Sequence, residues 1–280
     1  MVEVFMIELN CRFCGESLQP TSIGRIVNGY ELFSCPKCES IGVLSEPTPD
    51  QVKKIYDELF SVGGYDQHRE EFRLIKQGKV PRSPYRHLLL KFIETRLKGR
   101  KMLEIGGGIG SFGVYAESRG WDYTDFDVSE AAVNFAHDLG IKSNCFSSAN
   151  PPSLPSAEYD LVVMWEVIEH VYDVKGYLDE IYRTLKPGGM YLLSTPNYYR
   201  TAYQKSDFGI LGSPPVHINF FTKKALESIL TESGFEKVNV YKRRLYFPTK
   251  LSFRESKTIF QRLLALEESP TLIGIARKPQ

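Results

Sequence analysis

The sequence predicts an α/β fold, in which a mostly parallel sheet carries helices on both faces and follows a small cysteine-rich module. Three observations lead to this prediction. Strand-like and helix-like segments alternate from Lys101 to Ser233, a glycine-rich turn follows the first of these strands, and two close cysteine pairs lie near the N-terminus. Strands and helices that alternate at this spacing are typical of a parallel sheet covered on both faces.

The cysteine pairs come first along the chain. Cys11 and Cys14 form one C-x2-C pair and Cys35 and Cys38 form the other, with the 20 residues 15–34 between them. Two such turns supply the four thiolates of a structural zinc site, so residues 1–45 are predicted to form a zinc-ribbon-like module. So small a module cannot hold a core of its own, and we expect zinc to supply most of its folding energy. Disulfides or redox pairs are the alternative, which the lack of an export signal disfavours.

The composition of the whole chain limits the partners and the cellular location to be expected. The chain has 280 residues, 42% of them hydrophobic, and a net charge of +1. This balance gives no sign of a general phosphate-binding surface, so nucleic acid is not the expected partner. The sequence begins without a signal-peptide pattern and its apolar runs are too short to span a bilayer, so we expect a cytoplasmic protein with no membrane contact. The oligomeric state does not follow from the sequence.

Residues 46–98 are predicted to form a helical lid or linker, and residues 99–280 the α/β domain. Helical patterns run from Gln51 to Lys98, with an interruption at Ser61–Gly64. In the α/β domain, strands are expected at Lys101–Ile105, Asp122–Phe126, Ile141–Phe146, Tyr159–Met164, Met190–Ser194, Lys237–Tyr246 and Thr271–Arg277. Helices are expected at Ser111–Arg119, Ser129–Leu139, Val174–Leu185, Thr222–Ser233 and Thr258–Ala265.

The glycine-rich turn, LEIGGGIGSF at residues 103–112, is a candidate cofactor site. Glycines let the backbone turn sharply and approach a ligand closely, and the following helix points its N-terminus at that ligand. A dinucleotide enzyme can carry a similar loop. Two details argue for another cofactor: Glu104 comes just before the glycines, and Asp127 ends the next strand, where it can accept hydrogen bonds from ribose hydroxyls.

Several motifs in order resemble those of the class I S-adenosylmethionine-dependent methyltransferases: LEIGGGIGSF, DFDVSEAAVNFA, YDLVVMWEVIEHV, LKPGGMYLLSTPN, HINFFT and SGF. The resemblance covers about residues 101–279 and implies a Rossmann-like, seven-stranded sheet with an antiparallel final strand. It also implies S-adenosylmethionine as cofactor. Its site would comprise Glu104, Gly106, Gly108 and Gly110 around the methionine part, Asp127 at the ribose and Val128 beside the adenine, with Ser148 and Trp165 as further contacts. Many members carry an acidic residue where this chain has Ser148.

The candidate reaction centre follows the fourth strand, in DLVVMWEVIEHV at residues 160–171. Carboxylates and an imidazole beside apolar walls are costly unless they are paired, hydrated or bound. The cluster resembles that of magnesium- or manganese-dependent O-methyltransferases, such as small-RNA 2′-O-methyltransferases and ubiquinone-pathway enzymes. There an E-x-x-E-H cluster, joined in the RNA enzymes by a later histidine, holds the metal. Glu166, Glu169, His170 and His217 match these positions, which implies Mg or Mn as one alternative.

A second resemblance is to sugar C-methyltransferases that begin with a zinc module. Cys11-Arg12-Phe13-Cys14-Gly15 matches their C-R-x-C-G motif. The resemblance implies that Tyr65, His170 and His217 surround the acceptor, with His217 as general base. This chain departs from that family in having Val216, and no glutamate, before His217, and in ending without a further C-terminal domain. The alternatives are that Glu169 interacts with the positive end of a helix dipole and that His170 is a buried structural histidine bonded to the backbone.

We therefore expect an S-adenosylmethionine-dependent methyltransferase that acts on a hydroxylated small molecule, such as a sugar, sugar nucleotide or secondary metabolite, by O- or C-methylation. The helical segment is expected to close over the active site, and the zinc module to shape the acceptor entrance. An RNA methyltransferase and a non-catalytic, cofactor-binding regulator are the alternatives.

Overall fold

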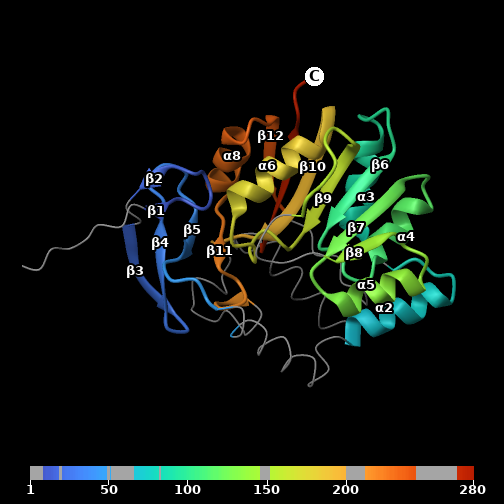
Figure 1. Ribbon diagram of the computed structural model, residues 1–280, viewed down its shortest axis with the longest axis horizontal. Coiled ribbons are helices and arrows are strands. Elements are labelled where there is room, and N and C mark those ends of the chain that lie inside the picture. Colours follow the sequence, from blue (N-terminus) through green and yellow to red (C-terminus); the bar gives the residue numbers. More distant parts are fainter. Residues whose placement is uncertain are drawn as a thin grey trace, which may run out of the picture.

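The computed structural model describes residues 9–18, 21–48, 51, 66–81, 83–145, 152–199, 212–243 and 270–280. Two sheets organise these residues, a large one covered by helices and a small one built mainly from the N-terminal module (Figure 1). The predicted site residues Tyr65 and Ser148 and the predicted helix Thr258–Ala265 lie outside the described residues.

The large sheet has seven strands in the order β12-β13-β10-β9-β6-β7-β8. They are β6 (Lys101–Ile105), β7 (Asp122–Asp127), β8 (Ser143–Cys145), β9 (Tyr159–Trp165), β10 (Leu185–Pro196), β12 (Glu236–Lys242) and β13 (Thr271–Arg277). Neighbours from β8 to β10 are parallel, whereas β13 is antiparallel to both of its neighbours. The predicted α/β class and the Rossmann-like seven-stranded sheet are confirmed.

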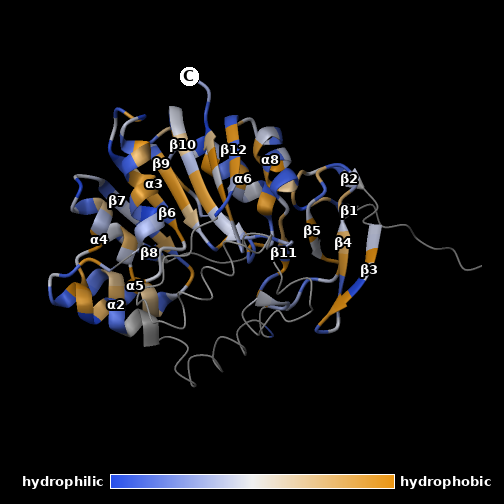
Figure 2. Ribbon diagram, turned by 180° about the vertical axis from the view of Figure 1, so that it is seen from behind, coloured by the Kyte–Doolittle hydropathy of each residue, from blue (hydrophilic) through white to orange (hydrophobic). Residues whose placement is uncertain are grey.

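Helices cover both faces of this sheet. One face carries α3 (Pro84–Glu94), α4 (Ser111–Glu117) and α5 (Glu130–Asp138), with α2 (Asp66–Lys76) against α4; the other carries α6 (Val174–Thr184) and α8 (Lys223–Glu232). Successive strand residues point to opposite faces, so Val162 and Met164 of β9 pack with α6 and α8, and Leu161 and Val163 with α3 and α4. Hydrophobic and hydrophilic residues alternate along α2 and α8 (Figure 2), as expected of helices with one buried side.

Polar side chains fix the starts of three helices. Ser129, Asp173 and Thr222 precede α5, α6 and α8, and each side chain accepts a hydrogen bond from a backbone N–H in the first turn. Such caps satisfy donors that have no partner within the helix. They explain why two helices predicted to begin at Ser129 and Thr222 begin one residue later.

Some predicted boundaries were wrong. Strand β10 was predicted to span Met190–Ser194 but begins at Leu185, which already pairs with Tyr159 of β9. The register of the β9–β10 pairing shifts between Leu185 and Met190, and Gly188 has a φ of +74° there. The segment with Gly188 and Gly189 therefore forms a bulge within one strand, and Leu185, predicted to end a helix, begins that strand.

The small sheet joins the N-terminal module to the rest of the chain. Its order is β11-β5-β4-β3, with β3 (Thr21–Val27), β4 (Tyr30–Ser34) and β5 (Ile41–Val43) from the module and β11 (Asn219–Phe220) from far along the sequence. A separate strand pair, β1 (Leu9–Asn10) and β2 (Ser17–Leu18), lies beside it. One buried cluster combines Val27, Leu32, Ile41 and Val43 with Tyr198, Ile218 and Phe220. The module thus shares a core with the large domain.

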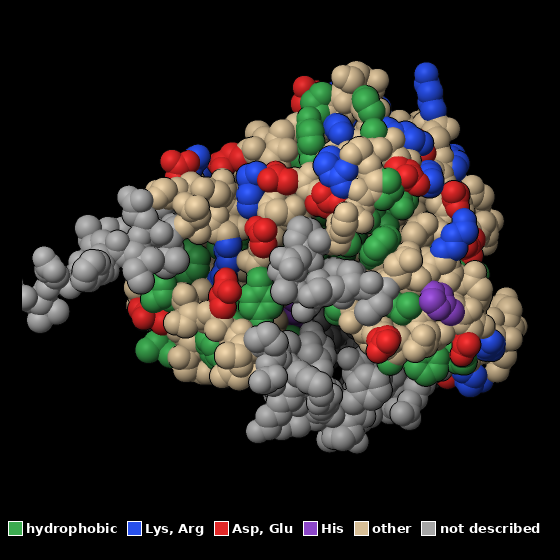
Figure 3. Space-filling view, in the orientation of Figure 1, with side chains coloured by type: hydrophobic (Ala, Val, Ile, Leu, Met, Phe, Trp, Pro, Cys, Tyr) green, Lys and Arg blue, Asp and Glu red, His purple; other side chains and the backbone are tan. Residues whose placement is uncertain are grey.

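Among the described helices, we find none with the length and apolarity needed to cross a membrane. On the face shown in Figure 3, lysine and arginine side chains are interspersed with aspartate and glutamate. The described residues of that face therefore form no large patch of one sign.

Candidate active site

The glycine-rich turn connects β6 to α4 and is fixed by the neighbouring strand. Gly106, Gly108 and Gly110 have φ values of +77°, +62° and +74°. The amide of Gly108 donates to Oδ2 of Asp127 at 2.8 Å, and the amide of Gly107 to Oδ1 of Asp125 at 2.9 Å. A Cβ added to Gly106 would lie 2.4 Å from Cγ2 of Val167. The turn therefore needs glycine both for its backbone conformation and for close packing.

Three buried carboxyl groups, those of Glu104, Asp125 and Asp127, stand behind this turn. Glu104 is 1% exposed, and its Oε2 accepts a hydrogen bond from the Tyr123 hydroxyl at 2.5 Å. Burial raises the pKa of Glu104 to about 7, opposed by the charge of Arg86. Burial also raises the pKa of Asp125, and Glu104 and Asp127 add to the shift. These shifts favour the neutral acids in the ligand-free protein, and a cationic ligand beside them would favour the ionised forms.

The raised pKa of Glu104 predicts a pH-dependent stability. Its ordinary pKa is 4.5 and its folded pKa about 7, so its contribution is fully present below pH 4.5 and lost as the pH rises through about 7. Glu104→Gln, which resembles the protonated acid, is expected to raise the Tm of the ligand-free protein at about pH 8 more than at about pH 5. Scanning calorimetry at both pH values measures this, and equal shifts would contradict it.

Trp165 is the last residue of β9, close to the glycine-rich turn, and aromatic rings pack against its side chain. Its ring meets Phe112 at 5.6 Å and Tyr85 at 6.0 Å between centroids, both edge-to-face. Its indole Nε1 is buried, and no hydrogen-bond partner for it lies in the described part of the chain. A buried donor of this kind is available to a ligand. Val128, which follows Asp127, is 51% exposed and offers an apolar surface at the end of β7.

Arg86 is a site residue that sequence reasoning missed. Its guanidinium lies 5.3 Å from the centre of the Trp165 ring, and its Nε donates to the Tyr85 hydroxyl at 3.1 Å. It also interacts electrostatically with Glu104. The available signal was spacing: Arg86 lies four and seven residues before Leu90 and Ile93, which are fully buried, so all three share one side of α3. A charge on the buried side of a helix indicates a partner there.

Glu169, His170 and His217 form a cluster whose potential ligand atoms all lie within 4.8 Å of one another. The rings of His170 and His217 are 4.6 Å apart, edge-to-face, and Nε2 of His170 is 3.9 Å from Oε1 of Glu169. Nδ1 of His170 lies 2.9 Å from the carbonyl oxygen of Val216, so it carries the proton and donates. Burial lowers the pKa of His170. Its Nε2 is the ring nitrogen near the Glu169 carboxyl.

Backbone hydrogen bonds hold the two segments of this cluster together. The amides of Ile218 and Asn219 both donate to the carbonyl of Glu169 at 3.0 Å. The side-chain amide of Asn219 donates to the carbonyls of Ile168 and Val171. Thr195 of β10 donates to Oε2 of Glu169 at 3.0 Å. The turn after β9 and the strand that follows His217 therefore behave as one unit.

Glu166 stands apart from this cluster. It begins the turn after β9 with a φ of +55°, and its amide donates to the carbonyl of Ser194 at 2.9 Å. Of the four residues that match the E-x-x-E-H pattern and its later histidine, the structure brings three within ligand distance of one another and leaves Glu166 outside. The proposed roles of all four, and of the glycine-turn residues, stay predictions.

The four N-terminal cysteines also come together. The sulfur atoms of Cys11 and Cys38 are 4.0 Å apart and those of Cys14 and Cys35 are 3.9 Å apart. A tetrahedral zinc site with Zn–S bonds of about 2.3 Å separates its sulfurs by about 3.8 Å, whereas a disulfide places them about 2 Å apart. Each pair closes a tight turn, with Gly15 donating to the Cys11 carbonyl and Glu39 to the Cys35 carbonyl. The arrangement fits four-cysteine metal coordination.

Comparison with known proteins places these features in a family. The model of the methyltransferase domain family matches residues 77–240. Over 147 residues, 50% of this chain and 54% of the relative, the sequence is 33% identical to a probable S-adenosylmethionine-dependent methyltransferase of Mycolicibacterium smegmatis. It is 29% identical over 170 residues to a ubiquinone biosynthesis O-methyltransferase of Rickettsia conorii, covering 57% of this chain and 58% of the relative. The matches thus span little more than half of these curated relatives.

A solved structure, phosphoethanolamine N-methyltransferase 2 of Haemonchus contortus in complex with S-adenosyl-L-methionine, superposes with a TM-score of 0.55. It is 18% identical, and the match covers 81% of this chain and 60% of that chain. At this identity the likeness shows a shared fold.

Proposed function

This chain belongs to the methyltransferase domain family of class I, S-adenosylmethionine-dependent enzymes, and on that premise we propose that it methylates a hydroxylated small molecule. A sugar, sugar nucleotide or secondary metabolite is the proposed acceptor class. The observation that carries the proposal is the cluster of Glu169, His170 and His217, which follows β9 at the same end of the sheet as the glycine turn after β6. On this proposal, the cluster supplies an acid–base group at the end of the sheet that binds the cofactor.

The residues around the turn fit S-adenosylmethionine. The cofactor carries a sulfonium and an ammonium group, and positive charge there would favour the ionised forms of the buried Glu104, Asp125 and Asp127 carboxyls. Arg86 is proposed to meet the carboxylate of the methionine part, and the unsatisfied Nε1 of Trp165 to donate to the cofactor. When bound, S-adenosylmethionine supplies an electrophilic methyl group. Holding the acceptor in line with that group is the task of the protein.

We propose His217 as the general base. Transfer of a methyl group to a hydroxyl breaks one S–C bond, forms one O–C bond and releases the hydroxyl proton, which an imidazole nitrogen can accept. His170 is held by the Val216 carbonyl and Glu169 by Thr195, so both are suited to orient the base and the acceptor. Glu169 and His217 are buried, whereas His170 is partly exposed.

A divalent metal at the same cluster is the second candidate for how the site works. Two imidazoles and one carboxylate form a donor set that Mn²⁺ accepts, and a metal there would grip acceptor oxygens. A mild chelator that spares thiolate-bound zinc, followed by Mg²⁺ or Mn²⁺, separates the two mechanisms. Turnover that falls and returns with metal supports a metal centre, and unchanged turnover supports His217 acting alone.

We also propose that Cys11, Cys14, Cys35 and Cys38 hold a structural zinc ion. The sulfur spacing described above supports this assignment, as does the closeness of all four potential ligands. Free thiolates suit a reducing compartment, so the cytoplasm remains the proposed location.

Methyl transfer from labelled S-adenosylmethionine to a panel of acceptors tests the function. The panel contains nucleotide sugars, catechols and other hydroxylated aromatics, and short RNAs. We expect label in a hydroxylated small molecule. Label in RNA alone would contradict the proposed acceptor class. The salt dependence of RNA binding would then show how many phosphates the protein contacts.

A further inference from the structure

We infer that the N-terminal module positions His217, and that Arg12 and Asn28 are the two side chains through which it does so. The inference rests on the proposed role of His217 and adds a function for the module beyond holding zinc. Neither residue belongs to the cysteine shell or to the Glu169–His170–His217 cluster. Both are positioning residues, since they contact the segment that carries His217 and not the histidine ring.

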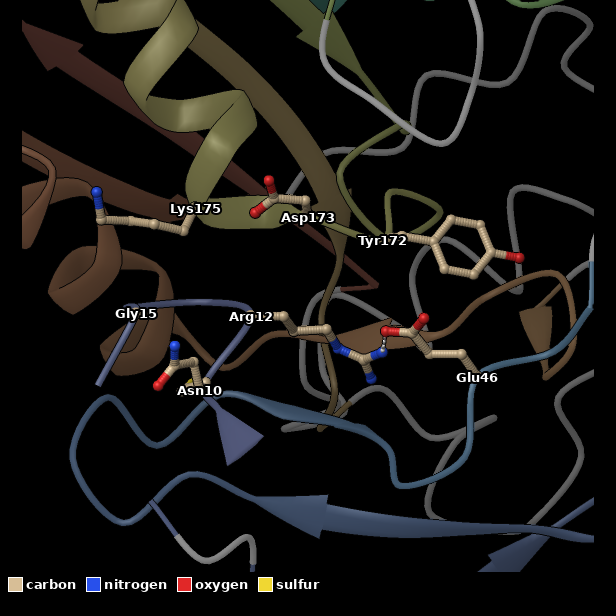
Figure 4. A pocket seen from close by; sticks show the side chains of 8 residues that line it. Asn10, Arg12, Gly15, Glu46, Tyr172, Asp173 and Lys175 are labelled. Carbon is tan, nitrogen blue, oxygen red and sulfur yellow. Dashed lines mark hydrogen bonds and ion pairs between the residues drawn. The ribbon is translucent and has the colours of Figure 1, made fainter. Parts of the chain in front are cut away.

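Arg12 reaches from the first cysteine turn to the backbone next to His217. Its Nη2 donates to the carbonyl of Ile218 at 3.3 Å and to that of Val43 at 2.8 Å, and its Nη1 pairs with Glu46 at 3.2 Å. The side chain is only 10% exposed. Figure 4 shows the extended Arg12 side chain and its ion pair with Glu46 at the edge of a pocket of about 400 Å³. A guanidinium so buried is held in one geometry.

Both backbone groups of Ile218, the residue after His217, make hydrogen bonds that hold it in place. The carbonyl of Ile218 accepts hydrogen bonds from the amide of Val43 in β5, at 3.0 Å, and from Arg12. The amide of Ile218 donates to the carbonyl of Glu169 at 3.0 Å. The next residues, Asn219 and Phe220, form β11 and pair with β5. The module and the Glu169 turn therefore meet at the residue adjacent to His217.

Asn28 holds the other end of the same loop. It lies in the Asn28–Gly29 turn between β3 and β4 with a φ of +49°. Its side-chain amide donates to Oγ of Ser213 at 2.9 Å and to the carbonyl of Pro214 at 3.0 Å. The carbonyl of Ser213 in turn accepts from the amide of His217 at 3.0 Å. The module thus holds the loop both before and after the histidine.

The consequence is a catalytic site completed from outside the α/β domain. A general base acts only within hydrogen-bond reach of its proton, and a displacement of about 1 Å can cost about a hundredfold in rate. Loss of Arg12 or Asn28 frees the loop locally without touching the cofactor turn, which is built from β6 and β7.

Four variants of the zinc-loaded full chain test this. Arg12→Met keeps the length and removes the donors, and Arg12→Lys keeps one donor. Asn28→Gly tolerates the positive φ and removes the amide. Lys37→Met is the matched control, because Lys37 lies between the second cysteine pair as Arg12 lies between the first, but is exposed and pairs with Glu16. Diethyl pyrocarbonate reactivity of His217, read by mass spectrometry, reports how firmly the loop is held.

We expect Arg12→Met to speed modification of His217 at least about fivefold, as the loss of charge-assisted hydrogen bonds implies. Asn28→Gly should act in the same direction, Arg12→Lys should restore part of the protection, and Lys37→Met should match the wild type. Zinc content and affinity for S-adenosylhomocysteine should not change in any of them. Unchanged His217 reactivity in both Arg12→Met and Asn28→Gly would overturn the inference.

Measuring kcat with the acceptor identified in the panel distinguishes a failure of this inference from a failure of the proposed function. Arg12→Met should lower kcat with cofactor affinity unchanged, and should add nothing in a His217→Ala background. If His217→Ala keeps full turnover, His217 is not the base. The modification rates of His217 in Arg12→Met and Asn28→Gly then still test, by themselves, whether the module positions this residue. If Arg12→Met lowers kcat equally in the His217→Ala background, Arg12 acts by another route and the inference fails.

Discussion

Replacing His217 with alanine is expected to lower kcat by about 10²–10⁴-fold, the usual contribution of a positioned general base. The buried ring lies beside His170, and the loop that carries it is bonded to the Glu169 turn and to the N-terminal module. On the proposed mechanism, the proton of the acceptor hydroxyl then loses its base. Steady-state kinetics with the identified acceptor measure the effect.

The control for this substitution is His87→Ala. His87 lies on α3 and stacks on Tyr115 with ring centres 3.6 Å apart, away from the Glu169–His170–His217 cluster. Its loss should leave kcat within about threefold of the wild type, as is usual for a substitution outside the site. Affinity of His217→Ala for S-adenosylhomocysteine should equal that of the wild type. A His217→Ala enzyme with wild-type kcat would remove the base from the mechanism.

Replacing Cys38 with serine is expected to abolish zinc binding and unfold the N-terminal module. Structural zinc contributes about 10–16 kcal/mol in small zinc-folded peptides, far more than one hydrogen bond. The module also supplies β5, Arg12 and Asn28, all of which contact residues 213–220. Loss of zinc should therefore lower kcat as severely as loss of His217, while the cofactor turn stays formed. Zinc content, kcat and cofactor affinity are the three measurements.

Cys145→Ser is the matched control, since Cys145 is the fifth cysteine and belongs to β8, an edge strand of the large sheet. It should keep one zinc per chain and wild-type turnover. If Cys38→Ser loses zinc but keeps full turnover, the module does not position the active site, and its role lies elsewhere.

Local sequence patterns predicted the α/β domain well. Strands β6 and β13 have the predicted bounds, because short apolar runs bounded by polar residues and turns leave little choice of end. The glycine turn was predictable because only glycine suits its backbone. The sheet order, with an antiparallel last strand, came from resemblance to a family and not from local pattern.

The pairing of strands that lie far apart along the chain could not be predicted from the sequence. Nothing in Asn219–Phe220 shows that these residues add a strand to the N-terminal sheet, because a two-residue strand has no periodicity. Arg12 was noticed only as part of a cysteine motif, and its contact with Ile218 depends on that pairing. The E-x-x-E-H pattern and the later histidine implied four metal ligands, but Glu166, with a φ of +55°, lies outside the cluster of the other three.

Binding of the cofactor product is the most direct test of the account. Calorimetric titration of the zinc-loaded chain with S-adenosylhomocysteine should show one site per chain. Gly106→Ala should weaken this binding at least about tenfold, because a non-glycine residue at its φ of +77° costs about 1–2 kcal/mol and the added Cβ would lie 2.4 Å from Val167. A folded wild-type chain that binds neither S-adenosylhomocysteine nor S-adenosylmethionine would contradict the proposed cofactor site and the methyl transfer built on it.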